Sequence, residues 1–347
     1  MVDKTTNVLF VIDAPEELRA HLARQLADVP ELALTFADPP EEARFLELAP
    51  AADVLVGWRV SAEVLAAAGR LKQYIFGGVG AQTVLKLIAA ENARRRERGG
   101  PEITLIKSTA NTYATAQHAM ALFLALTNKI VPHHNWLAKG LWRRGDDYAQ
   151  SVTLRGRRIG LLGYGDVNQK VHRFLAGFDV EFAALTRTVR GFAGAPTPVA
   201  GYTVDQLDAF LDAVDVLFVG VPLTSRTTGL IRREHLRRLG PDGLIVNVGR
   251  GAVIDEAGLY AALHAGEIAG AALDVWYEYR PEPDDAGRRY PYAPEHPFHE
   301  LANVVLSPHR AASPVFALTR WNEVADYLRR FAAGDPPLNV VDIAREY

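Results

Sequence analysis

The sequence predicts an α/β protein made of two doubly wound domains, each built around a parallel sheet. Short apolar runs typical of buried strands alternate with helical segments, and this alternation starts a second time near Arg158 in the chain of 347 residues. The segment "RIGLLGYGDVNQK" at 158–170 places a glycine turn directly after an expected strand and before an expected helix. Sheets of this kind bind nucleotides at such a turn.

The composition is that of an ordinary globular protein. Hydrophobic residues make up 49% of the chain and charged residues 23%, and the length is sufficient for two domains with a core each. The net charge of −3 argues against a nucleic-acid partner, which would require a basic surface. The lack of cysteine excludes disulfides, thiolate metal sites and cysteine nucleophiles.

The lengths of the apolar runs indicate where in the cell the protein is expected. The run "VLFVI" at 8–12 has five apolar residues and is followed by acids, which is not typical of a signal peptide. No stretch of the sequence approaches the ~18 consecutive apolar residues that a membrane span requires. We therefore expect a cytoplasmic protein with no membrane partner.

In the first half of the chain, β-rich runs are separated by segments with helical periodicity. The expected strands are "NVLFVIDA" (7–14), "LALTFAD" (32–38), "DVLVGW" (53–58), "QYIFGG" (73–78) and "ITLIKS" (103–108). The expected helices include 16–28 and 61–69. The charge run "ENARRRERGGP" at 91–101 is interpreted as a solvated helix end and loop, with a docking patch as the alternative.

The second half begins with one long apolar helix, expected from Asn111 to Lys139. The strands expected after it are 158–163, 180–185, 214–220, 243–248, 270–276 and 303–308. A last helix at 316–334 is expected to carry the tail 336–347 back to the first domain. The predicted domains are therefore 1–111 with 316–347, and 112–315.

The glycine turn favours a dinucleotide. Gly163 and Gly165 allow a tight turn and close approach of the backbone to a pyrophosphate, and the free N–H groups of Asp166 and Val167 would meet the phosphates. Asn168 stands where a third glycine would allow close packing of helix and strand, so we expect it to affect packing more than phosphate contact. A purely structural strand–helix turn is the alternative.

The end of the second strand of this domain favours NADP over NAD. An acid there would bind an NAD ribose, but the chain has Thr186, Arg187 and Thr188. A guanidinium between two hydroxyls suits a phosphate dianion. NAD remains the alternative cofactor, with Arg187 as a mere surface charge.

Several stretches together resemble the D-isomer-specific 2-hydroxyacid dehydrogenases over nearly the whole chain. The stretch "VNVGRGAVIDEAGLYAALHAGEIAGAALDVW" (246–276) resembles the signature region of that family, and "NVVLSPHRA" (303–311) resembles the strand that carries its histidine. "GVPLTSRTTGLI" (220–231) resembles the segment over the cofactor, and "LKQYIFGGVGAQTV" (71–84) the loop that binds the substrate carboxylate. "NTYATAQHA" (111–119) resembles the interdomain helix, with Gln117 for the usual glutamate and Thr115 for the usual valine.

The resemblance implies a flavodoxin-like substrate domain and a Rossmann cofactor domain with the active site in the cleft between them. Arg250 would hold the substrate carboxylate and polarise its keto oxygen, and His309 would protonate that oxygen. A carboxylate would orient the imidazole and raise its pKa. Backbone N–H groups of Val79 and Gly80 would hold the other side of the substrate carboxylate, and Asn111 would line the same cleft.

The same resemblance, with the glycine turn, gives the residues expected at the cofactor, among which Asp274 would meet the nicotinamide carboxamide. They are Thr115, Gly163, Tyr164, Gly165, Asp166, Val167, Thr186, Arg187, Thr188, Val221, Pro222, Thr227, Val248, Gly249, Asp274, His309 and Ala311.

The acid expected beside His309 is displaced in this sequence. The family has a glutamate five residues after the aspartate that matches Asp274, and this chain has Tyr279 there. Glu278 is the candidate because a bulge at a strand end can restore the direction of its side chain. Tyr279 as a neutral partner and Glu282 are the alternatives. The tyrosine- and proline-rich insertion after Arg280 is expected near the cleft mouth.

Structural roles compete with these assignments. Arg250 alternatively serves as a turn residue and His309 as a structural histidine, and structural roles are assigned to His118, His133, His134 and His172. His296 and His299 stand beside acids, but Pro297 separates them and no third ligand is clustered there, so no metal site is expected.

The resulting hypothesis is an oxidoreductase that transfers a hydride between NADP(H) and a small 2-keto or 2-hydroxy acid, similar to a glyoxylate or hydroxypyruvate reductase. Its partner would be a small anionic substrate, and the resemblance implies a homodimer. One alternative is a catalytically weak, nucleotide-sensing binding protein of the same fold. The other is a dehydrogenase of a different small anion, such as formate or phosphite.

Overall fold

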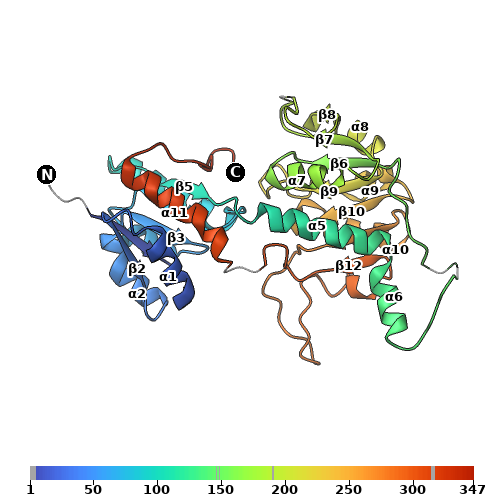
Figure 1. Ribbon diagram of the computed structural model, residues 1–347, viewed down its shortest axis with the longest axis horizontal. Helices are drawn as coiled ribbons and strands as arrows, with labels where there is room; N and C mark the ends of the chain where they lie inside the picture. Colours follow the sequence, from blue (N-terminus) through green and yellow to red (C-terminus); the bar gives the residue numbers. More distant parts are fainter. Residues whose placement is uncertain (1–4, 146, 148, 190, 314–316) are drawn as a thin grey trace. The chain divides into compact units, whose positions relative to one another are not determined.

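The computed structural model describes residues 5–145, 147, 149–189, 191–313 and 317–347. The chain divides into two compact units, Met1–Asn111 with Ser313–Tyr347 and Thr112–Ala312, here named the first and the second unit (Figure 1). The boundary expected at 315/316 lies outside the described residues. Within the described part, no helix is both long and apolar enough to cross a membrane.

The first unit contains a five-stranded parallel sheet in the order β2-β1-β3-β4-β5. This is the flavodoxin-like order, and the expected strands are confirmed. The strands are β1 Thr6–Phe10, β2 Leu32–Phe36, β3 Val54–Gly57, β4 Gln73–Phe76 and β5 Thr104–Lys107. The helices are α1 Glu16–Gln25, α2 Glu42–Leu48, α3 Ala62–Ala67, α4 Gln82–Glu97 and α11 Leu318–Ala333, with a short 3₁₀ turn at Ala49–Ala51.

Helices cover both faces of this sheet, which is why its central strands are continuous apolar runs. Leu55 of β3 packs into a core with α3 and α4, whereas its neighbours Val54 and Val56 pack with α1 and α11. The C-terminal tail returns to the unit as expected. Val340 forms an antiparallel bridge with Ile106 of β5, and Val341 N donates to Leu105 O at 2.8 Å.

The charge run at 91–101 is only partly solvated. Arg95 is buried near the end of α4 and donates to the carbonyls of Ala68 and Leu71 at 2.7 and 2.6 Å. Its Nε also donates to the buried Glu91 carboxylate at 3.2 Å. The expected solvated helix end is therefore wrong for Arg95, because the loops after α3 offer carbonyls that the guanidinium satisfies.

The second unit contains a seven-stranded parallel sheet in the order β12-β11-β10-β9-β6-β7-β8. The strands are β6 Arg158–Leu162, β7 Glu181–Leu185, β8 Val199–Tyr202, β9 Val216–Val219, β10 Leu244–Asn247, β11 Gly270–Leu273 and β12 Val304–Leu306. The longer helices are α5 Thr112–Thr127, α6 Ile130–Leu137, α7 Asp166–Leu175, α8 Leu207–Asp212, α9 Arg233–Leu239 and α10 Glu256–His264. Three 3₁₀ turns lie at Val204–Gln206, Gly251–Val253 and Phe298–Glu300.

Two cores lie on the two faces of this sheet. One is formed with α5 and α7, and the other with α8, α9 and α10. Leu161 of β6 packs into the first and its neighbour Leu162 into the second. The apolar runs predicted every strand of this sheet except β8, an edge strand.

The single helix expected from Asn111 to Lys139 is wrong, because the segment forms α5 and α6 with a break between them. The side chains of Thr127 and Asn128 donate to helix carbonyls of Phe123 and Leu124 at 3.0 Å. Lys129 follows with a φ of 54°, in the left-handed region. A residue in this conformation ends a helix, so the chain changes direction before α6 begins.

Candidate nucleotide-binding and catalytic site

The turn after β6 has the geometry of a phosphate cradle. Gly163 adopts a φ of 83°, and a Cβ there would lie 2.8 Å from Val221 Cγ1, so glycine is required. Gly165 has nothing within 4 Å of the position of a Cβ and precedes α7 directly. The N–H groups at the start of this ten-residue helix are therefore open to a ligand, and the turn fits the pyrophosphate of a dinucleotide.

The turn lies at the point where the strand order of the second unit reverses. β6 has β7 on one side and β9 on the other, and the connections leave in opposite directions. Ligands bind in such sheets outside the carboxyl ends of the strands at this switch point. Gly163 follows β6 and Gly220 follows β9, so both border the position that this rule predicts for a nucleotide.

Asn168 does not hold α7 away from the sheet. Its side chain is buried, and Nδ2 donates to the carbonyls of Gly163 and Leu162 at 2.7 and 3.2 Å. The space comes from Gly220, because a Cβ at that position would lie 2.6 Å from Asn168 Nδ2. The glycine missing from α7 is thus replaced by a glycine after β9.

The side chain of Tyr164 is engaged inside the unit. Its hydroxyl is hydrogen-bonded to His172 Nδ1 at 2.8 Å, and the other ring nitrogen of His172 is bonded to Thr197 Oγ1 at 2.8 Å. Burial lowers the pKa of His172 to about 4, which agrees with its assignment as a structural histidine. Any contact between Tyr164 and a phosphate would therefore be made by its backbone.

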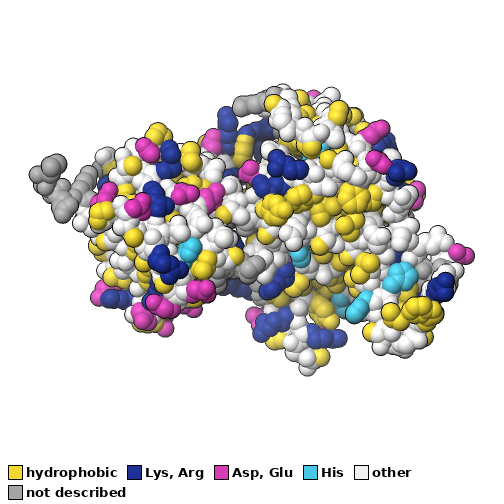
Figure 2. Space-filling view, viewed as in Figure 1, with side chains coloured by type: hydrophobic (Ala, Val, Ile, Leu, Met, Phe, Trp, Pro, Cys, Tyr) yellow, Lys and Arg dark blue, Asp and Glu magenta, His cyan; other side chains and the backbone are white. Residues whose placement is uncertain are grey.

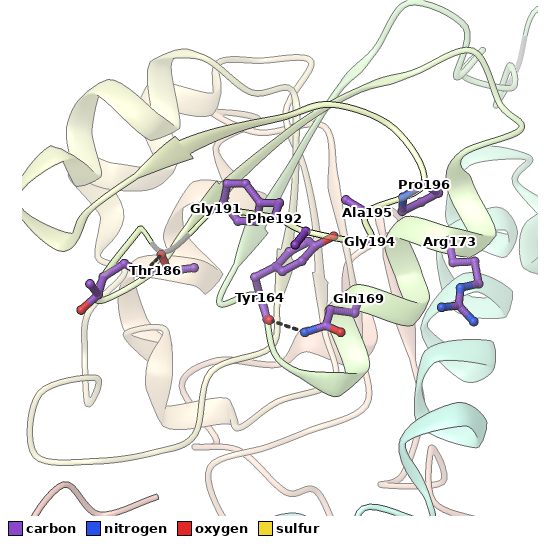
Figure 3. Close-up of a pocket in the computed structure, with 11 residues that line it drawn as sticks. Tyr164, Gln169, Arg173, Thr186, Gly191, Phe192, Gly194, Ala195 and Pro196 are labelled. Carbon is purple, nitrogen blue, oxygen red and sulfur yellow. Dashed lines mark hydrogen bonds between the residues drawn. The ribbon is translucent and has the colours of Figure 1, made fainter.

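A cavity of about 260 Å³ lies beside the turn, between the start of α7 and the loop 191–196 (Figure 3). Thr186 and Thr188, which follow β7, both line it, and Thr186 Oγ1 donates to Thr188 O at 3.1 Å. The described lining residues are Tyr164, Gln169, Arg173, Thr186, Thr188, Gly191, Phe192, Ala193, Gly194, Ala195 and Pro196. Among these described lining residues the cation is Arg173, for which no sequence motif predicted a role.

Arg250 follows β10 in a turn that its neighbours hold rigidly. Asn247 Nδ2 donates to Arg250 O, and Asn247 Oδ1 accepts from Gly249 N, both at 3.1 Å. A Cβ at Gly251 would lie 2.3 Å from Trp276 O, so glycine is needed for this close approach. Arg250 is half-buried, and burial lowers the pKa of its guanidinium.

Asp274 follows β11 and organises the neighbouring strand end. This buried carboxylate accepts hydrogen bonds from Arg310 N at 2.7 Å and Ala311 N at 2.9 Å. It also accepts from Ser307 Oγ at 2.5 Å. These groups flank His309, whose φ of 56° is unusual for a residue other than glycine. Asp274 therefore stabilises the strained turn that presents the imidazole.

His118 belongs to the same cluster, although the sequence analysis gave it only a structural role. Its Nε2 lies 2.8 Å from Ser307 Oγ and 3.3 Å from Asp274 Oδ1. Position 118 is on α5 and is 189 residues away from Ser307 along the chain. No local sequence pattern connects the two, since α5 meets the strand ends only in the folded unit.

The carboxylate of Glu278, the expected partner of His309, is engaged with another group in the structure. The carboxylate of Glu278 is exposed and accepts a hydrogen bond from Arg280 N at 2.6 Å. The ring beside the imidazole is that of Tyr279, with centroids 5.2 Å apart and an interplanar angle of 84°. Tyr277 N and Glu278 N both donate to Pro291 O, so two consecutive residues face one carbonyl as in a bulge, yet the Glu278 side chain stays exposed.

The expected rise in the pKa of His309 is also wrong. His309 lies exposed at the end of β12, yet the protein around it still lowers the pKa of the imidazole by desolvation. Asp274 opposes this change and the positive charge of Arg250 adds to it. The charges of Arg250 and Asp274 both act on His309, and the three residues follow the adjacent strands β10, β11 and β12.

The other predicted residues are distributed over both units. Thr227 Oγ1 donates to Pro222 O at 2.6 Å, which holds the loop after Val221 in shape. Thr115 on α5, Val248 and Ala311 are buried in the second unit. Val79 and Gly80, which follow β4, and Asn111, which precedes α5, belong to the first unit.

The two histidines near Pro297 each lie beside a protein side chain. His296 Nδ1 lies 3.3 Å from Glu256 Oε1, and His299 Nδ1 is hydrogen-bonded to the Tyr292 hydroxyl at 2.9 Å. His299 also stacks on Tyr290, with ring centroids 4.1 Å apart. Among the described residues, no group of three or more histidine, aspartate or glutamate side chains is placed to hold a metal ion.

Known proteins resemble the chain in sequence. The family model "D-isomer specific 2-hydroxyacid dehydrogenase, NAD binding domain" matches residues 120–311. D-3-phosphoglycerate dehydrogenase from Mycobacterium tuberculosis is 31% identical over 309 residues, which are 88% of this chain and 54% of the relative. The chain therefore spans about half the length of that relative. Glyoxylate reductase from Pyrococcus furiosus is 33% identical over 237 residues, or 67% of this chain and 66% of the relative.

A solved structure resembles the fold as well. An NADPH-dependent glyoxylate/hydroxypyruvate reductase from Sinorhizobium meliloti, in complex with citrate, superimposes with a TM-score of 0.75. It is 26% identical, and the match covers 97% of this chain and 98% of that one. With the family model matching more than half of the residues, the chain belongs to the D-isomer specific 2-hydroxyacid dehydrogenase family.

Proposed function

We propose that the protein is an oxidoreductase that reduces a small 2-keto acid, of the size of glyoxylate or hydroxypyruvate, with NADPH. The observation that carries this proposal is the cluster of Arg250, Asp274 and His309 at the ends of three adjacent strands. These strands belong to the same sheet as β6, which the glycine turn that fits a dinucleotide follows. The glyoxylate reductases among the relatives support the substrate class.

The residues divide the chemistry between them. The nicotinamide, when bound, supplies the hydride to the keto carbon. Arg250 offers a planar pair of donors to the substrate carboxylate and a positive charge near the keto oxygen as negative charge develops there. His309 gives its proton to that oxygen. Asp274 accepts hydrogen bonds from the backbone N–H groups of Arg310 and Ala311, which follow His309, so the imidazole keeps its orientation.

We assign the first unit to the substrate and the second to the cofactor. Backbone N–H groups of Val79 and Gly80, with Asn111, would contribute to holding the substrate carboxylate. Homodimerisation is part of the proposal, because apolar side chains gather on the surface around α6 (Figure 2). The exposed members of this group are Ile130, Val131, Leu137, Leu141 and Trp142. The cytoplasm as location stays a prediction from the sequence.

Turnover of a defined panel tests the proposed reaction. We expect NADPH absorbance to fall with glyoxylate, hydroxypyruvate or larger 2-keto acids, and Arg250→Ala to lower kcat/KM by at least about 10³-fold. Arg155→Ala is the matched control, since Arg155 forms an exposed ion pair with Asp179. Formate and phosphite with NADP⁺ complete the panel. Tight NADPH binding without turnover of any substrate would favour a nucleotide-sensing protein instead.

The cofactor preference has its own test. Thr186, Arg187 and Thr188 follow β7 without an acid, and removal of the guanidinium takes away a partner for the 2′-phosphate. Arg187→Ala should raise the KM for NADPH roughly tenfold or more and leave the KM for NADH almost unchanged. A wild-type protein that prefers NADH would overturn the assignment of NADP.

A further inference from the structure

The position beside His309 is occupied by an aromatic ring. Tyr279 meets the imidazole edge-on, with ring centroids 5.2 Å apart at 84°. This is the geometry that aromatic pairs prefer, since a positive ring edge faces a negative ring face. The contact restricts rotation of the imidazole without a hydrogen bond to either of its nitrogens.

Tyr279 is held in this place by a short loop. Its hydroxyl accepts a hydrogen bond from Trp276 N at 3.3 Å, three residues earlier in the chain. The buried Trp276 donates through Nε1 to Ser307 O at 2.8 Å, two residues before His309. One tryptophan therefore connects the loop that carries the phenol ring to the turn that carries the imidazole.

Among the described residues, the charges that act on His309 are those of Asp274 and Arg250, Tyr279 contacts its ring, and His118 lies 3.3 Å from Asp274. Asp274 is committed to Ser307 Oγ and to two backbone N–H groups, so it acts on the imidazole only through space. Desolvation raises the pKa of the Tyr279 hydroxyl, so the phenol stays neutral at physiological pH. The direct neighbour of the imidazole thus carries no charge.

We infer that Tyr279 is the positioning residue of His309, a neutral group that fixes the imidazole by ring contact where an anion would fix it by charge. The inference rests on the proposed function for its kinetic consequence. Reduction consumes the imidazolium proton, so the rate is full below the pKa of His309 and falls as pH rises through it. With a neutral ring in contact instead of an anion, His309 loses its proton at a lower pH, and reduction is confined to a lower pH range.

The titration of His309 in the cofactor-free protein tests the inference without turnover. The protein is labelled with ¹³C-histidine, and the His309 signal is assigned with His309→Gln. Tyr279→Glu places an anion next to the ring and should raise the apparent pKa by about one unit or more. Tyr279→Phe keeps the ring and should leave the pKa within about 0.3 units. Glu278→Gln is the matched control, expected to change nothing.

Two results would overturn the inference. One is a pKa of His309 that is the same in Tyr279→Glu and in the wild type. The other is a shift in Glu278→Gln, which would make Glu278 the partner. If Tyr279→Glu does not fold, Tyr279→Leu removes the ring instead. It should broaden the His309 signal, and an unchanged signal would contradict ring contact.

Kinetics separate positioning from folding. In Tyr279→Leu, kcat for 2-keto acid reduction should fall roughly tenfold or more, with little change in KM, because the proton donor is no longer oriented. In Tyr279→Phe, kcat should be retained. In Tyr279→Glu, the alkaline fall of kcat/KM should move to higher pH by the same amount as the titration. A titration shift with no turnover would reject the proposed reaction and keep the positioning role.

Discussion

At the scale of single residues, the side chain of Asn168 fills the space that a side chain at Gly220 would need. Asn168 fills the space under the start of α7 with a buried amide that donates to carbonyls of the turn. Gly220 provides this space from the end of β9, 52 residues later in the chain. A motif inspected one position at a time shows only the missing glycine. The compensation becomes visible once β6 and β9 are known to be neighbours.

Gly220→Ala is expected to destabilise the protein through Asn168. The new Cβ would lie 2.6–2.9 Å from atoms of the Asn168 amide, so the free energy of unfolding should fall by roughly 1–3 kcal/mol. In the Asn168→Ala background the same substitution should cost less than half as much. Urea unfolding of the wild type, the two single variants and the double variant measures the coupling energy between positions 168 and 220.

The control is Gly177→Ala, where a Cβ meets nothing within 4 Å. This change should stay within about 0.5 kcal/mol of the wild type. Additive effects of Gly220→Ala and Asn168→Ala would contradict the shared volume.

The site residues show which predictions a sequence supports. Arg250 and His309 were proposed because the segments that carry them resemble those of a known family, and each follows an apolar run that forms a strand. Of the three candidates for the partner of His309, the ring of Tyr279 contacts the imidazole, and the sequence could not choose it because the direction of a side chain after a strand depends on loop contacts such as those with Pro291 O. His118 was missed because its partners, Ser307 and Asp274, are distant in the chain.

At the scale of elements, a buried strand can be recognised in the sequence more easily than an exposed one. Strands covered on both faces are continuous apolar runs, which is why the sequence analysis identified nearly all of them. β8 was not identified because its residues Ala200 and Gly201 are exposed and neither favours a strand. The break between α5 and α6 was missed because apolar periodicity continues across Lys129, while side-chain bonds to helix carbonyls end α5.

The second stability prediction concerns Arg95, near the end of α4. Arg95→Ala should lower the free energy of unfolding by roughly 2–3 kcal/mol, because it leaves the buried Glu91 carboxylate with the Arg94 guanidinium alone and removes the donor to the Leu71 carbonyl. Arg96→Ala is the neighbouring control, since Arg96 and Glu102 form an exposed ion pair. Guanidinium unfolding should show a change within about 0.5 kcal/mol for that control. Equal effects of the two substitutions would refute the buried role of Arg95.

At the scale of the whole molecule, each unit has its own hydrophobic cores. Every buried member of the two cores around the seven-stranded sheet lies within 112–312, and every buried member of the other two lies in the first unit. The repeated strand–helix alternation predicted this division, because each doubly wound sheet buries its own two faces. The second unit is one continuous stretch of chain inserted into the first.

A protein consisting of residues 112–312 alone is therefore expected to fold and to bind NADPH. All the proposed cofactor residues from Thr115 to Ala311 lie in this stretch, so its Kd for NADPH, measured by nicotinamide fluorescence, should be within about tenfold of that of the full chain. Turnover of 2-keto acids should be lost, because Val79, Gly80 and Asn111 are missing. Gly163→Ala in the same stretch should abolish binding while circular dichroism stays unchanged, since the Cβ clashes with Val221 at the phosphate turn. A folded 112–312 protein that does not bind NADPH would contradict the assignment of the cofactor to the second unit.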